Sequence, residues 1–395
     1  MRRWKIWTPL LAVVATAALA CGDGDGPSDP ETPANALKFT ALSAGYFHTC
    51  GLTTAGAAYC WGGNTSGLLG DGTQTTRNRP AAVVGGLSFT AIDAGAAHTC
   101  ALTAGGQAFC WGWNDEGQLG DGTFQARPEP VTVSGNRTFV AVSAGHAHSC
   151  ALASGGAAYC WGDDSSGQLG DGGPGPQSRS AVPVAVSGGL RFAVVQAGYY
   201  QTCGLTIGGG AYCWGQNDSG QNGDGTTVTR HVPVRVAVGN NMSVIGAGDR
   251  FVCGVSGGVT FCWGANRHGE LGAGAPSGSA VPIPLAGAPA FISVATSIGA
   301  STVPTAEAYG CGLESGGAAA CWGGAIRGMR AGAADGFAPL GPGIRFQLLA
   351  AGSQHVCGLR RDGYAFCAGG NYSGQLGDGT FEDRSSAVPV EGPSD

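Results

Sequence analysis

The chain has 395 residues, of which 74 are Gly, while charged residues make up only 12% and the formal net charge is −6. No Gly-X-Y period runs through it, which excludes collagen, and a hydrophobic content of 43% with nine Trp is enough for a packed core, which argues against a disordered chain. Lys occurs only at positions 5 and 38, so the sequence also lacks the basic clusters that bind a nucleic-acid backbone.

Residues 1–21 have the pattern of an export signal. Three basic residues among the first five precede an apolar run over residues 6–20, which is too short for a comfortable membrane span. The following Ala18-Leu19-Ala20-Cys21 resembles the lipobox of bacterial lipoproteins, and Cys21 is the one Cys of 15 that falls outside a regular pair. We therefore predict lipidation at Cys21, with simple secretion as the alternative.

The rest of the chain divides into a linker and one repetitive domain. Residues 22–36 are rich in Gly, Asp and Pro and contain no aromatic residue, which predicts a flexible acidic tether. Residues 37–392 form seven repeats of about 50 residues. Each repeat carries versions of Ala-Gly-x-x-His-Thr-Cys-x-Leu, a Gly-bearing turn, Tyr-Cys-Trp-Gly-x-Asn, Ser-Gly-Gln-Leu-Gly-Asp-Gly-Thr and Pro-Val-x-Val.

The spacing within a repeat predicts a β-hairpin. In the first repeat, folding the chain about its turn sets Cys50 opposite Cys60 and leaves a three-residue loop that ends in Gly56, where a positive φ is needed. Five further repeats have Gly at the same place. In the remaining repeat the Cys pair is one residue closer, and the two-residue loop Gly257-Gly258 suits a tight turn.

Small and aromatic residues occupy opposed positions in the predicted hairpins. In six repeats a small residue such as Gly51 faces an aromatic such as Tyr59, and we expect that ring to cover the bare backbone of its partner. Trp61 and its five equivalents should fill the space between neighbouring sheets. An isolated hairpin is marginally stable in water, whereas radial stacking of small sheets buries both faces. The sequence therefore predicts an all-β, seven-bladed β-propeller.

At these motifs the chain resembles the regulator of chromosome condensation repeat family. The matching residues are Ala-Gly-Tyr-Phe-His-Thr-Cys-Gly-Leu at 44–52, Tyr-Cys-Trp-Gly-Gly-Asn at 59–64 and Ser-Gly-Gln-Leu-Gly-Asp-Gly-Thr at 373–380. The resemblance implies four-stranded blades and a ring closed by pairing of the chain ends, here residues 38–42 with residues 387–390.

The sixth repeat departs from the family pattern. Residues 327–332 replace its Gly-Gln-Leu-Gly signature, and residues 296–309 add length. The sequence leaves open whether this repeat is degenerate or specialised.

The Cys pairs predict seven disulfides between neighbouring strands. Directly opposed residues come close enough for a bridge, and an exported protein meets an oxidising compartment. Nine intervening residues do not form the short knuckles of a zinc site, and inert buried thiols are the alternative. The expected bridges are Cys50–Cys60, Cys100–Cys110, Cys150–Cys160, Cys203–Cys213, Cys253–Cys262, Cys311–Cys321 and Cys357–Cys367.

Residue types that suggest metal binding or catalysis have simpler explanations. His48, His98, His148 and His355 share one repeat position, but Phe251 also occupies it, so we expect a hydrogen bond from imidazole to neighbouring backbone rather than a metal. The Asp-Gly turns lack the alternating carboxylates of a calcium loop. No nucleophile elbow, Walker loop, zinc-protease motif or dinucleotide fingerprint occurs. We predict no metal, no cofactor and no catalytic residue.

Function is expected where the repeats differ from one another. The two residues before the His position should lie at the same end of all seven blades, and aromatic and Arg side chains on a rigid platform are typical of binding faces. The alternative is that the aromatic members fill the mouth of the channel. The predicted face for a protein or surface ligand comprises Tyr46, Phe47, His146, Tyr199, Tyr200, Asp249, Arg250 and Gln354.

Three functions compete on this basis. We favour an exported, monomeric binding scaffold, held by a lipid at Cys21 in the bacterial cell envelope, with enzyme inhibition as one concrete form. Guanine-nucleotide exchange on a small GTPase is the activity of the family's eukaryotic namesake, but export would separate the protein from the GTPase. A glycan-active enzyme would need two carboxylates in one cleft, for example Asp249 and Glu307.

Overall fold

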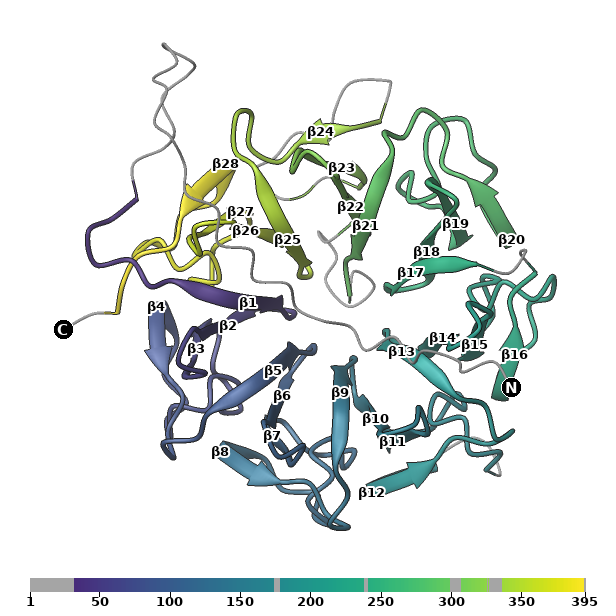
Figure 1. Ribbon diagram of the computed structural model, residues 1–395, viewed down its shortest axis with the longest axis horizontal. Coiled ribbons are helices and arrows are strands. Elements are labelled where there is room, and N and C mark those ends of the chain that lie inside the picture. The colour runs from purple at the N-terminus through teal and green to yellow at the C-terminus, as the bar shows by residue number, and fades with distance from the viewer. Residues whose placement is uncertain are drawn as a thin grey trace, which may run out of the picture.

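A computed structural model describes residues 32–173, 178–237, 241–298, 307–324, 326 and 336–393. Within these residues 28 strands form seven four-stranded antiparallel sheets, which surround a central axis as blades (Figure 1). The predicted all-β, seven-bladed propeller is thus confirmed. The described part of the chain contains no helix with the length and hydropathy of a membrane span. The predicted signal sequence, Cys21 and residues 22–31 of the predicted linker lie outside the described residues.

Each blade consists of four strands that pair in chain order, with the first strand nearest the axis and the fourth at the rim (Figure 1). The first strands are β1 (Phe39–Ala44), β5 (Phe89–Ala94), β9 (Phe139–Ala144), β13 (Phe192–Ala197), β17 (Met242–Ala247), β21 (Phe291–Thr296) and β25 (Phe346–Ala351). The second strands are β2 (His48–Thr53), β6 (His98–Thr103), β10 (His148–Ala153), β14 (Gln201–Thr206), β18 (Phe251–Ser256), β22 (Tyr309–Glu314) and β26 (His355–Arg360).

The outer half of each blade is formed by the third and fourth strands. The third strands are β3 (Ala58–Gly62), β7 (Ala108–Gly112), β11 (Ala158–Asp163), β15 (Ala211–Gly215), β19 (Val259–Ala265), β23 (Ala319–Gly323) and β27 (Ala365–Gly369). The fourth strands are β4 (Arg77–Ala82), β8 (Arg127–Thr132), β12 (Arg179–Ala185), β16 (Arg230–Arg235), β20 (Gly278–Pro284), β24 (Ala338–Pro339) and β28 (Arg384–Pro389). The unusual sixth repeat therefore still makes a four-stranded blade, although β24 has only two residues.

The second and third strands of each blade form the predicted hairpin. In blade 1, Cys50 lies opposite Cys60, and Gly56 in the turn has a φ of 79°. In blade 5 the turn consists of Gly257 and Gly258, with φ values of 58° and 80°, as expected for a two-residue turn with both central residues in the left-handed region. The register predicted from the Cys spacing is confirmed in all seven blades.

All seven Cys pairs form disulfides, as predicted. The bonded residues have Cα–Cα distances between 3.9 and 4.1 Å, and 13 of the 14 sulfur-bearing residues are completely buried, with Cys321 3% exposed. Each bridge joins two neighbouring strands of one blade, so none of the seven links one blade to another.

The prediction about the small residue beside each Cys pair needs correction. A Cβ added at Gly51 would lie 2.5 Å from a ring carbon of Phe39, on the first strand of the same blade. The same strand supplies Phe192 over Gly204 and Phe346 over Gly358. The ring that requires a bare backbone therefore comes from the first strand. The opposed aromatic on the third strand packs beside that ring, as Phe109 does beside Phe89 in blade 2, with ring centres 6.0 Å apart.

One backbone carbonyl joins neighbouring blades at six of the seven junctions, and Ala368 stands in place of the Trp at the junction of blades 6 and 7. At the junction of blades 1 and 2, the carbonyl of Leu68 accepts hydrogen bonds from Trp111 Nε1 at 2.9 Å and from Thr99 Oγ1 at 3.1 Å. Leu68 lies in the loop between β3 and β4, at the place that Gln holds in most repeats. The buried Trp of the Trp-Gly motif thus anchors the preceding blade through its indole N–H as well as filling the space between sheets.

The four histidines that share one repeat position bridge neighbouring blades. Their partner is a hydroxyl group and not the predicted backbone group. His48 Nε2 lies 2.9 Å from Thr99 Oγ1. Because Thr99 donates its own proton to Leu68, the imidazole must donate Nε2–H to Thr99. His98, His148 and His355 make the same contact with a Ser or Thr of the following blade at 2.8 Å. These rings are therefore structural, neutral donors.

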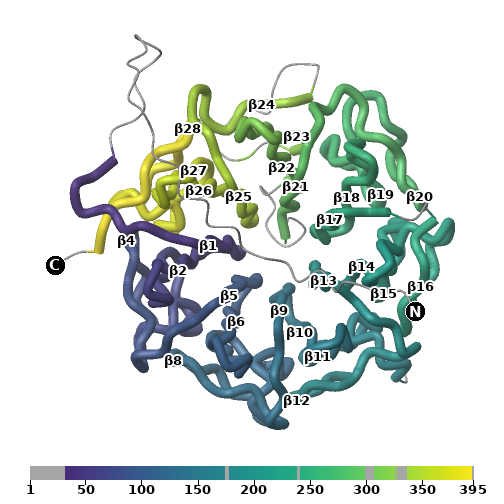
Figure 2. The backbone as a smooth tube through the Cα atoms, viewed as in Figure 1, coloured from purple at the N-terminus to yellow at the C-terminus, as the bar shows by residue number. Residues whose placement is uncertain are grey.

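The ring is not closed by pairing of the chain ends. β1 belongs to the first sheet and β28 to the last, so the predicted pairing of residues 38–42 with residues 387–390 is not observed. Each repeat supplies its own four strands, which leaves no incomplete blade for the other terminus to fill. Blade 1 and blade 7 lie side by side, in purple and yellow (Figure 2), and are joined by the ordinary junction: the carbonyl of Gln375 accepts from Trp61 and Thr49 at 3.0 and 2.9 Å.

Candidate functional site

One end of the propeller carries the long loops. In a four-stranded meander, the turns between first and second strands and the loops between third and fourth strands lie at the same end of the blade; we call these segments together the loop face. A cavity of about 610 Å³ opens on this face across blades 2, 3 and 4, and we call it the blade 3 cavity. Its lining consists of Trp113, Glu116, His146, Ala147, Asp163, Ser165, Ser178, Arg179 and Tyr200.

Trp113 and Asp163 line this cavity from the same position of two neighbouring repeats. Each directly follows the Trp-Gly motif, at the end of β7 and at the last residue of β11. The equivalent residues of the other repeats are Gly63, Gln216, Ala265, Gly324 and Gly370. The shared fold thus fixes where the residue after Trp-Gly lies in each blade. In blades 2 and 3, where the cavity lies, its side chain differs from those of the other repeats. The sequence prediction missed this position, although Trp113 is the single Trp of the repeats outside the Trp-Gly motif.

The carboxylate of Asp163 is held by neutral donors alone. It accepts hydrogen bonds from Ser165 N and Ser165 Oγ, both at 2.9 Å, and from Gln168 Nε2 at 2.6 Å. The residue is 7% exposed, and among the described residues no cation forms an ion pair with it. Asp163 is therefore a nearly buried negative charge without a positive partner.

Arg179 lies directly opposite Asp163 in β11 and β12, but no ion pair joins the two side chains. Its side chain instead crosses to blade 2. Nη1 donates to the carbonyl of Asp115 at 2.8 Å and lies 3.4 Å from Glu116 Oε2, while the guanidinium stands 4.3 Å from the ring centre of Phe124. The Arg of blade 3 thus binds the loop between the third and fourth strands of blade 2.

An aromatic cluster forms the wall of the cavity on the side of blade 4. The ring of His146 lies 4.1 Å from that of Tyr199 and 5.5 Å from that of Tyr200, centre to centre. Burial lowers the pKa of His146 to about 4, so the imidazole is neutral at physiological pH. Burial also raises the pKa of Tyr200, and the charges of Asp163 and Asp249 act in the same direction. The cluster is therefore uncharged, in a negative local field.

The eight residues of the predicted binding face do not share one environment. Those that are almost fully buried are Tyr46, Tyr199, Asp249 and Gln354, and those that are half-buried are Phe47, His146, Tyr200 and Arg250. The structure brings three of them, His146, Tyr199 and Tyr200, together at the blade 3 cavity.

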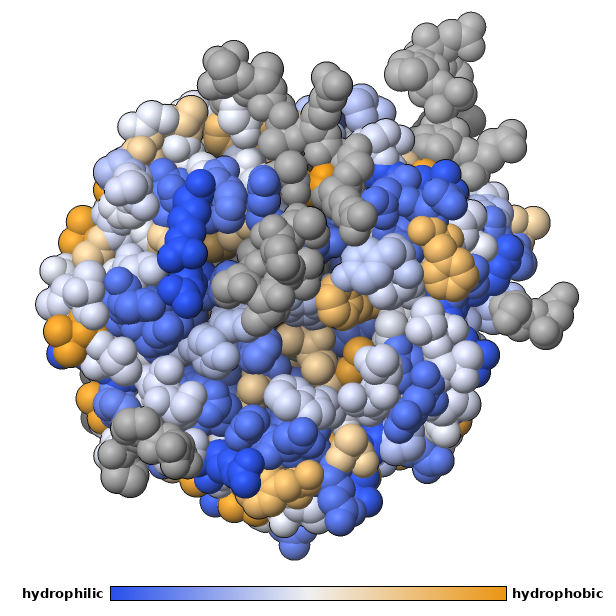
Figure 3. Space-filling view, turned by 180° about the vertical axis from the view of Figure 1, so that it is seen from behind, coloured by the Kyte–Doolittle hydropathy of each residue, from blue (hydrophilic) through white to orange (hydrophobic). Residues whose placement is uncertain are grey.

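The remaining members of the predicted face lie elsewhere on the ring. Tyr46 and Phe47 contact each other with ring centres 4.3 Å apart, and Phe47 also meets Tyr372 of blade 7 at 5.4 Å. Arg250 forms an ion pair with Asp218 at 3.1 Å. One whole face of the disc, seen in Figure 3, is mainly hydrophilic where it is coloured, with hydrophobic residues scattered over it. A defined cavity is therefore a stronger candidate site than a general apolar surface.

Glu307, the second carboxylate considered for glycan chemistry, is not found in the described cavity that Asp249 lines. Asp249 lines a small cavity of about 40 Å³ together with Arg250, His268 and Glu270, and Glu307 is not part of its lining. Glu270 is 2% exposed and accepts a hydrogen bond from the backbone N–H of His268 at 2.7 Å. This cavity is too small for a sugar ring.

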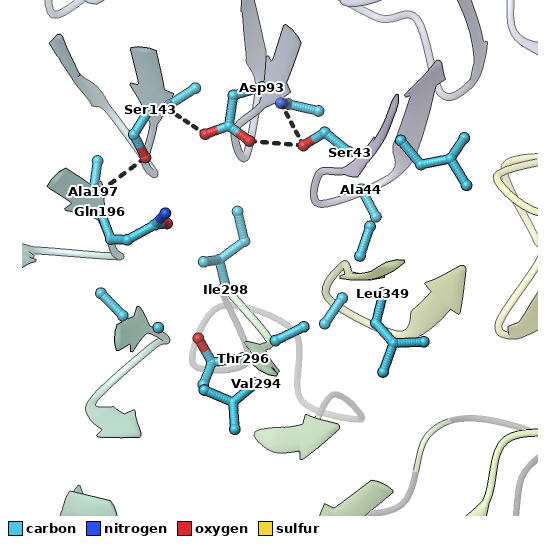
Figure 4. A pocket seen from close by; sticks show the side chains of 18 of the residues that line it. Ser43, Ala44, Asp93, Ser143, Gln196, Ala197, Val294, Thr296, Ile298 and Leu349 are labelled. Carbon is cyan, nitrogen blue, oxygen red and sulfur yellow. Dashed lines mark hydrogen bonds between the residues drawn. The ribbon is translucent and has the colours of Figure 1, made fainter. Parts of the chain in front are cut away.

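The central channel contains a cavity of about 210 Å³ between the first strands (Figure 4). Asp93 points into it and accepts hydrogen bonds from Ser43 Oγ at 2.7 Å and from the backbone N–H of Ala144 at 2.8 Å. Ser43 and Ser143 hold the same repeat position. Each hydroxyl accepts a hydrogen bond from a backbone N–H of the next blade, at 2.9 Å for Ser43 and 3.0 Å for Ser143. Burial raises the pKa of Asp93. These side chains connect blades 1 to 4.

The Asp-Gly loops are stabilised by internal contacts. Asp71 accepts from Thr73 N and from Arg77 Nε, both at 3.0 Å. Burial raises the pKa of Asp71, but hydrogen bonds from Thr73 and Arg77 outweigh it and bring the pKa below its ordinary value. Asp121, Asp224 and Asp378 have the same environment. Within the described ranges, no three His, Cys, Asp or Glu residues are grouped as metal ligands would be.

The same fold occurs in solved structures of low sequence identity. Human WBSCR16 is 20% identical, with a TM-score of 0.72 over 85% of this chain and 93% of that one. Prp20p from Saccharomyces cerevisiae is 22% identical, with a TM-score of 0.65 over 80% of each chain. The ectodomain of the Physcomitrella patens receptor kinase CR4 is 23% identical, with a TM-score of 0.53 over 84% and 74%. At these identities the likeness concerns the fold alone.

Sequence patterns extend the likeness to a family. No curated protein matches the chain. The pattern of the RCC1-like domain, however, matches residues 17–306, and the pattern of the regulator of chromosome condensation (RCC1) repeat matches residues 346–375. The first match alone spans more than half of the 395 residues. Together with the seven blades and their shared junctions, this match shows that the chain belongs to the RCC1-like domain family.

Proposed function

We propose that the protein is a binding scaffold that recognises another protein through its loop face, with the blade 3 cavity as the centre of recognition. The observation that carries the proposal is the cavity itself. Its volume of about 610 Å³ lies within the range of about 300–1,000 Å³ that is usual for ligand sites. It is lined by Trp113, Tyr200 and Arg179, residue types that contribute most to binding energy at interfaces.

The proposed scaffold acts outside the cytoplasm. Seven disulfides are typical of a protein that folds in an oxidising, extracytoplasmic environment. We propose in addition that Cys21 carries a lipid and anchors a monomeric propeller to the cell envelope. Mass spectrometry of the mature N-terminus tests this part: a diacylated Cys21 is expected, and an unmodified chain that retains residues 1–20 would contradict it.

The binding role is tested by capture of a partner from envelope and secreted fractions with wild-type protein and variants. Trp113→Gly introduces the residue that three other repeats have at this position, and Tyr200→Ala removes the opposite wall. Both are expected to weaken binding at least tenfold, with an unchanged melting temperature, since both side chains are partly exposed. The control is Ile207→Ala, at an exposed turn on the other end of blade 4, and it should bind normally.

Retention of the partner by both cavity variants would contradict the proposal. The same experiment addresses the two lesser functions. The published structure of Prp20p concerns its binding to Gsp1p and histones, so recovery of a GTPase would favour nucleotide exchange here. Glu116 and Asp163 place two carboxylates in one open cavity, so turnover of a polysaccharide that is lost in Asp163→Asn would favour a glycan-active enzyme.

A further inference from the structure

The side chains around the blade 3 cavity also indicate the chemistry of what it holds. Resting on the proposed binding function, we propose that the cavity takes up a cationic side chain, the ammonium of a Lys or the guanidinium of an Arg, that projects from the partner protein. Three properties of the lining carry this inference: its charge, its aromatic surface and its remaining hydrogen-bonding capacity.

The charge of the lining is negative and lacks local compensation. Its acidic and basic residues other than His146 are Glu116, Asp163 and Arg179. Arg179 lies 3.4 Å from Glu116, so that pair offsets itself, and His146 adds no charge because burial lowers its pKa to about 4. Among the residues that the structure describes, Asp163 is left with donors from Ser165 and Gln168. A nearly buried carboxylate without a counterion is costly, and a cation that enters the cavity would relieve that cost.

The aromatic surface suits the same ligand. Trp113, His146 and Tyr200 line the cavity, and the faces of aromatic rings attract cations, most strongly when the site is shielded from water. The surrounding structure already uses this contact, since the guanidinium of Arg179 stands 4.3 Å from the ring centre of Phe124. Arg179 is fixed on blade 2 by Asp115 and Glu116, and its charge is therefore not placed against Asp163.

Some hydrogen-bond donors of the wall are occupied by neighbouring residues. Ser165 donates its hydroxyl proton to Asp163, Ser178 donates to Asp164, and Arg179 donates to Asp115. The carboxylates of Asp163 and Glu116 keep lone pairs that can accept further protons. These lone pairs suit a ligand that offers N–H donors, such as Lys or Arg, better than they suit a carboxylate.

The inference is tested with blocked pentapeptides Gly-Gly-X-Gly-Gly in which X is Lys, Arg, Gln or Glu, and with chitotriose as a neutral glycan probe. Binding is measured by calorimetry and by saturation-transfer NMR at low and at physiological ionic strength. The Lys and Arg peptides are expected to bind at least tenfold more tightly than the Gln and Glu peptides, and added salt should weaken them. Equal binding of Lys and Gln peptides, or no binding of either cationic peptide, overturns the inference.

Variants assign the binding to the cavity. Asp163→Asn removes the charge but keeps an oxygen for Ser165, and Trp113→Gly removes the ring; each should lower affinity for the Lys peptide at least tenfold. Gln216→Gly, at the same repeat position of blade 4, is the matched control and should leave it unchanged. Chitotriose binding that survives in Asp163→Asn while the Lys peptide fails to bind would overturn the choice of a cation.

The two proposals fail in different ways. A captured partner that is lost with Trp113→Gly but retained by Asp163→Asn would leave the scaffold function intact and overturn the cationic ligand. A partner that is retained by Trp113→Gly and by Tyr200→Ala would remove the binding function itself. Melting temperatures and intact disulfides in every variant ensure that the loss of a ligand is not loss of the fold.

Discussion

A single amide-to-acid exchange sets blade 3 apart from its neighbours. In blade 1 the buried Asn64 donates Nδ2 to Asp71 Oδ1 and to the carbonyls of Thr73 and Thr75, each at 3.1 Å. The equivalent residue of blade 3 is Asp164, which is 2% exposed and keeps only the accepting role, toward Leu169 N at 2.9 Å. Burial raises the pKa of Asp164, and the nearby charge of Asp171 adds to the effect. The carboxylate is thus unfavourable at neutral pH.

We therefore expect Asp164→Asn to stabilise the protein, by about 1 kcal/mol at pH 7, which is typical of one restored hydrogen bond. A carboxyl whose pKa is raised on folding contributes stability below its ordinary pKa of 3.8 and loses it as the pH rises through the folded value. The gain should consequently be largest at neutral pH and disappear near pH 4. Urea unfolding at both pH values measures it.

The reverse exchange is the control for this prediction. Asn217 of blade 4 makes the same three donations as Asn64, so Asn217→Asp should destabilise the protein at pH 7. Equal stability of Asp164→Asn and the wild type at pH 7 would contradict the account given for blade 3.

Only some of the residues at the cavity could be identified from the sequence. His146, Tyr199 and Tyr200 were identified because they differ among repeats at the position before the His. Trp113 and Asp163 differ just as strongly at the position after Trp-Gly, a signal that was present and overlooked. The crossing of Arg179 to blade 2 is different, because it depends on a longer loop in the third repeat and on a neighbour from another repeat. Periodicity carries no information about such contacts.

At the scale of strands and blades, the junctions explain why residue types change together. Where the following blade offers Thr or Ser, at positions 49, 99, 149 and 202, the preceding blade has His. Where it offers Val252, Gly310 or Val356, the preceding blade has another residue. Among these, Gln201 donates to the carbonyl of Gly248 at 2.9 Å, and Tyr309 donates to the carbonyl of Gly352 at 3.0 Å. The sequence shows that the His of one repeat and the Thr or Ser of the next occur together. The hydrogen bond between the imidazole and that hydroxyl was not predicted.

The buried junction histidines predict an acid-sensitive fold. Burial lowers the pKa of His48 to about 4 and the pKa values of His98, His148 and His355 to about 3, from an ordinary 6.5. Their contribution to stability is complete above pH 6.5 and is lost as the pH falls toward the folded values, because the unfolded chain binds the protons first. Stability should therefore decrease steeply between pH 6.5 and pH 4.

Replacement of one junction histidine tests this prediction. His98→Gln should reduce the slope of unfolding free energy against pH below 6.5 by up to about 1.4 kcal/mol per pH unit, the value for one proton. The matched control is Gln201→Asn, because Gln201 holds the same repeat position in blade 4 and carries no titratable group, and its slope should equal that of the wild type. An unchanged slope in His98→Gln would show that the junction does not exclude the proton.

The strands themselves were largely predictable, because paired Cys residues fix a register more firmly than hydrophobic alternation does. Residues such as Cys50 and Cys60 leave only one alignment of the hairpin. The place of Phe39 over Gly51 was not predicted, since it depends on how the first strand lies beside the hairpin. The sequence shows that the first strand contains a Phe, but it does not show which Gly the Phe ring covers.

For the whole molecule, none of the seven disulfides joins two blades, and six of the seven junctions share the same Trp-to-carbonyl hydrogen bond. The number of blades follows directly from the number of repeats. The way in which the ring closes does not, because the expected pairing of the two chain ends in one blade was taken from the family pattern. In this chain the last junction, between Gln375 and Trp61, is one of these six. The two chain ends thus meet as successive repeats do at the other five.

The burial of every bridge predicts resistance to reduction in the native state. The bonded Cys residues are at most 3% exposed, so a reductant reaches them only after a blade opens. Native protein treated with dithiothreitol and iodoacetamide is expected to show none of the 14 Cys alkylated, and all 14 after treatment in denaturant, as measured by mass spectrometry. Alkylation of one pair under native conditions would identify a blade that opens by itself, and labelling of all pairs would contradict the packed junctions.

The disulfide pattern has a consequence for biogenesis. In each blade a Cys is bonded to the next Cys along the chain, nine or ten positions later. A polypeptide that enters an oxidising compartment N-terminus first therefore presents each correct partner immediately after its mate, before any Cys of a later blade has emerged. Oxidation in order of appearance yields the native set, so a thiol oxidase is sufficient and no isomerase has to correct mispaired bonds.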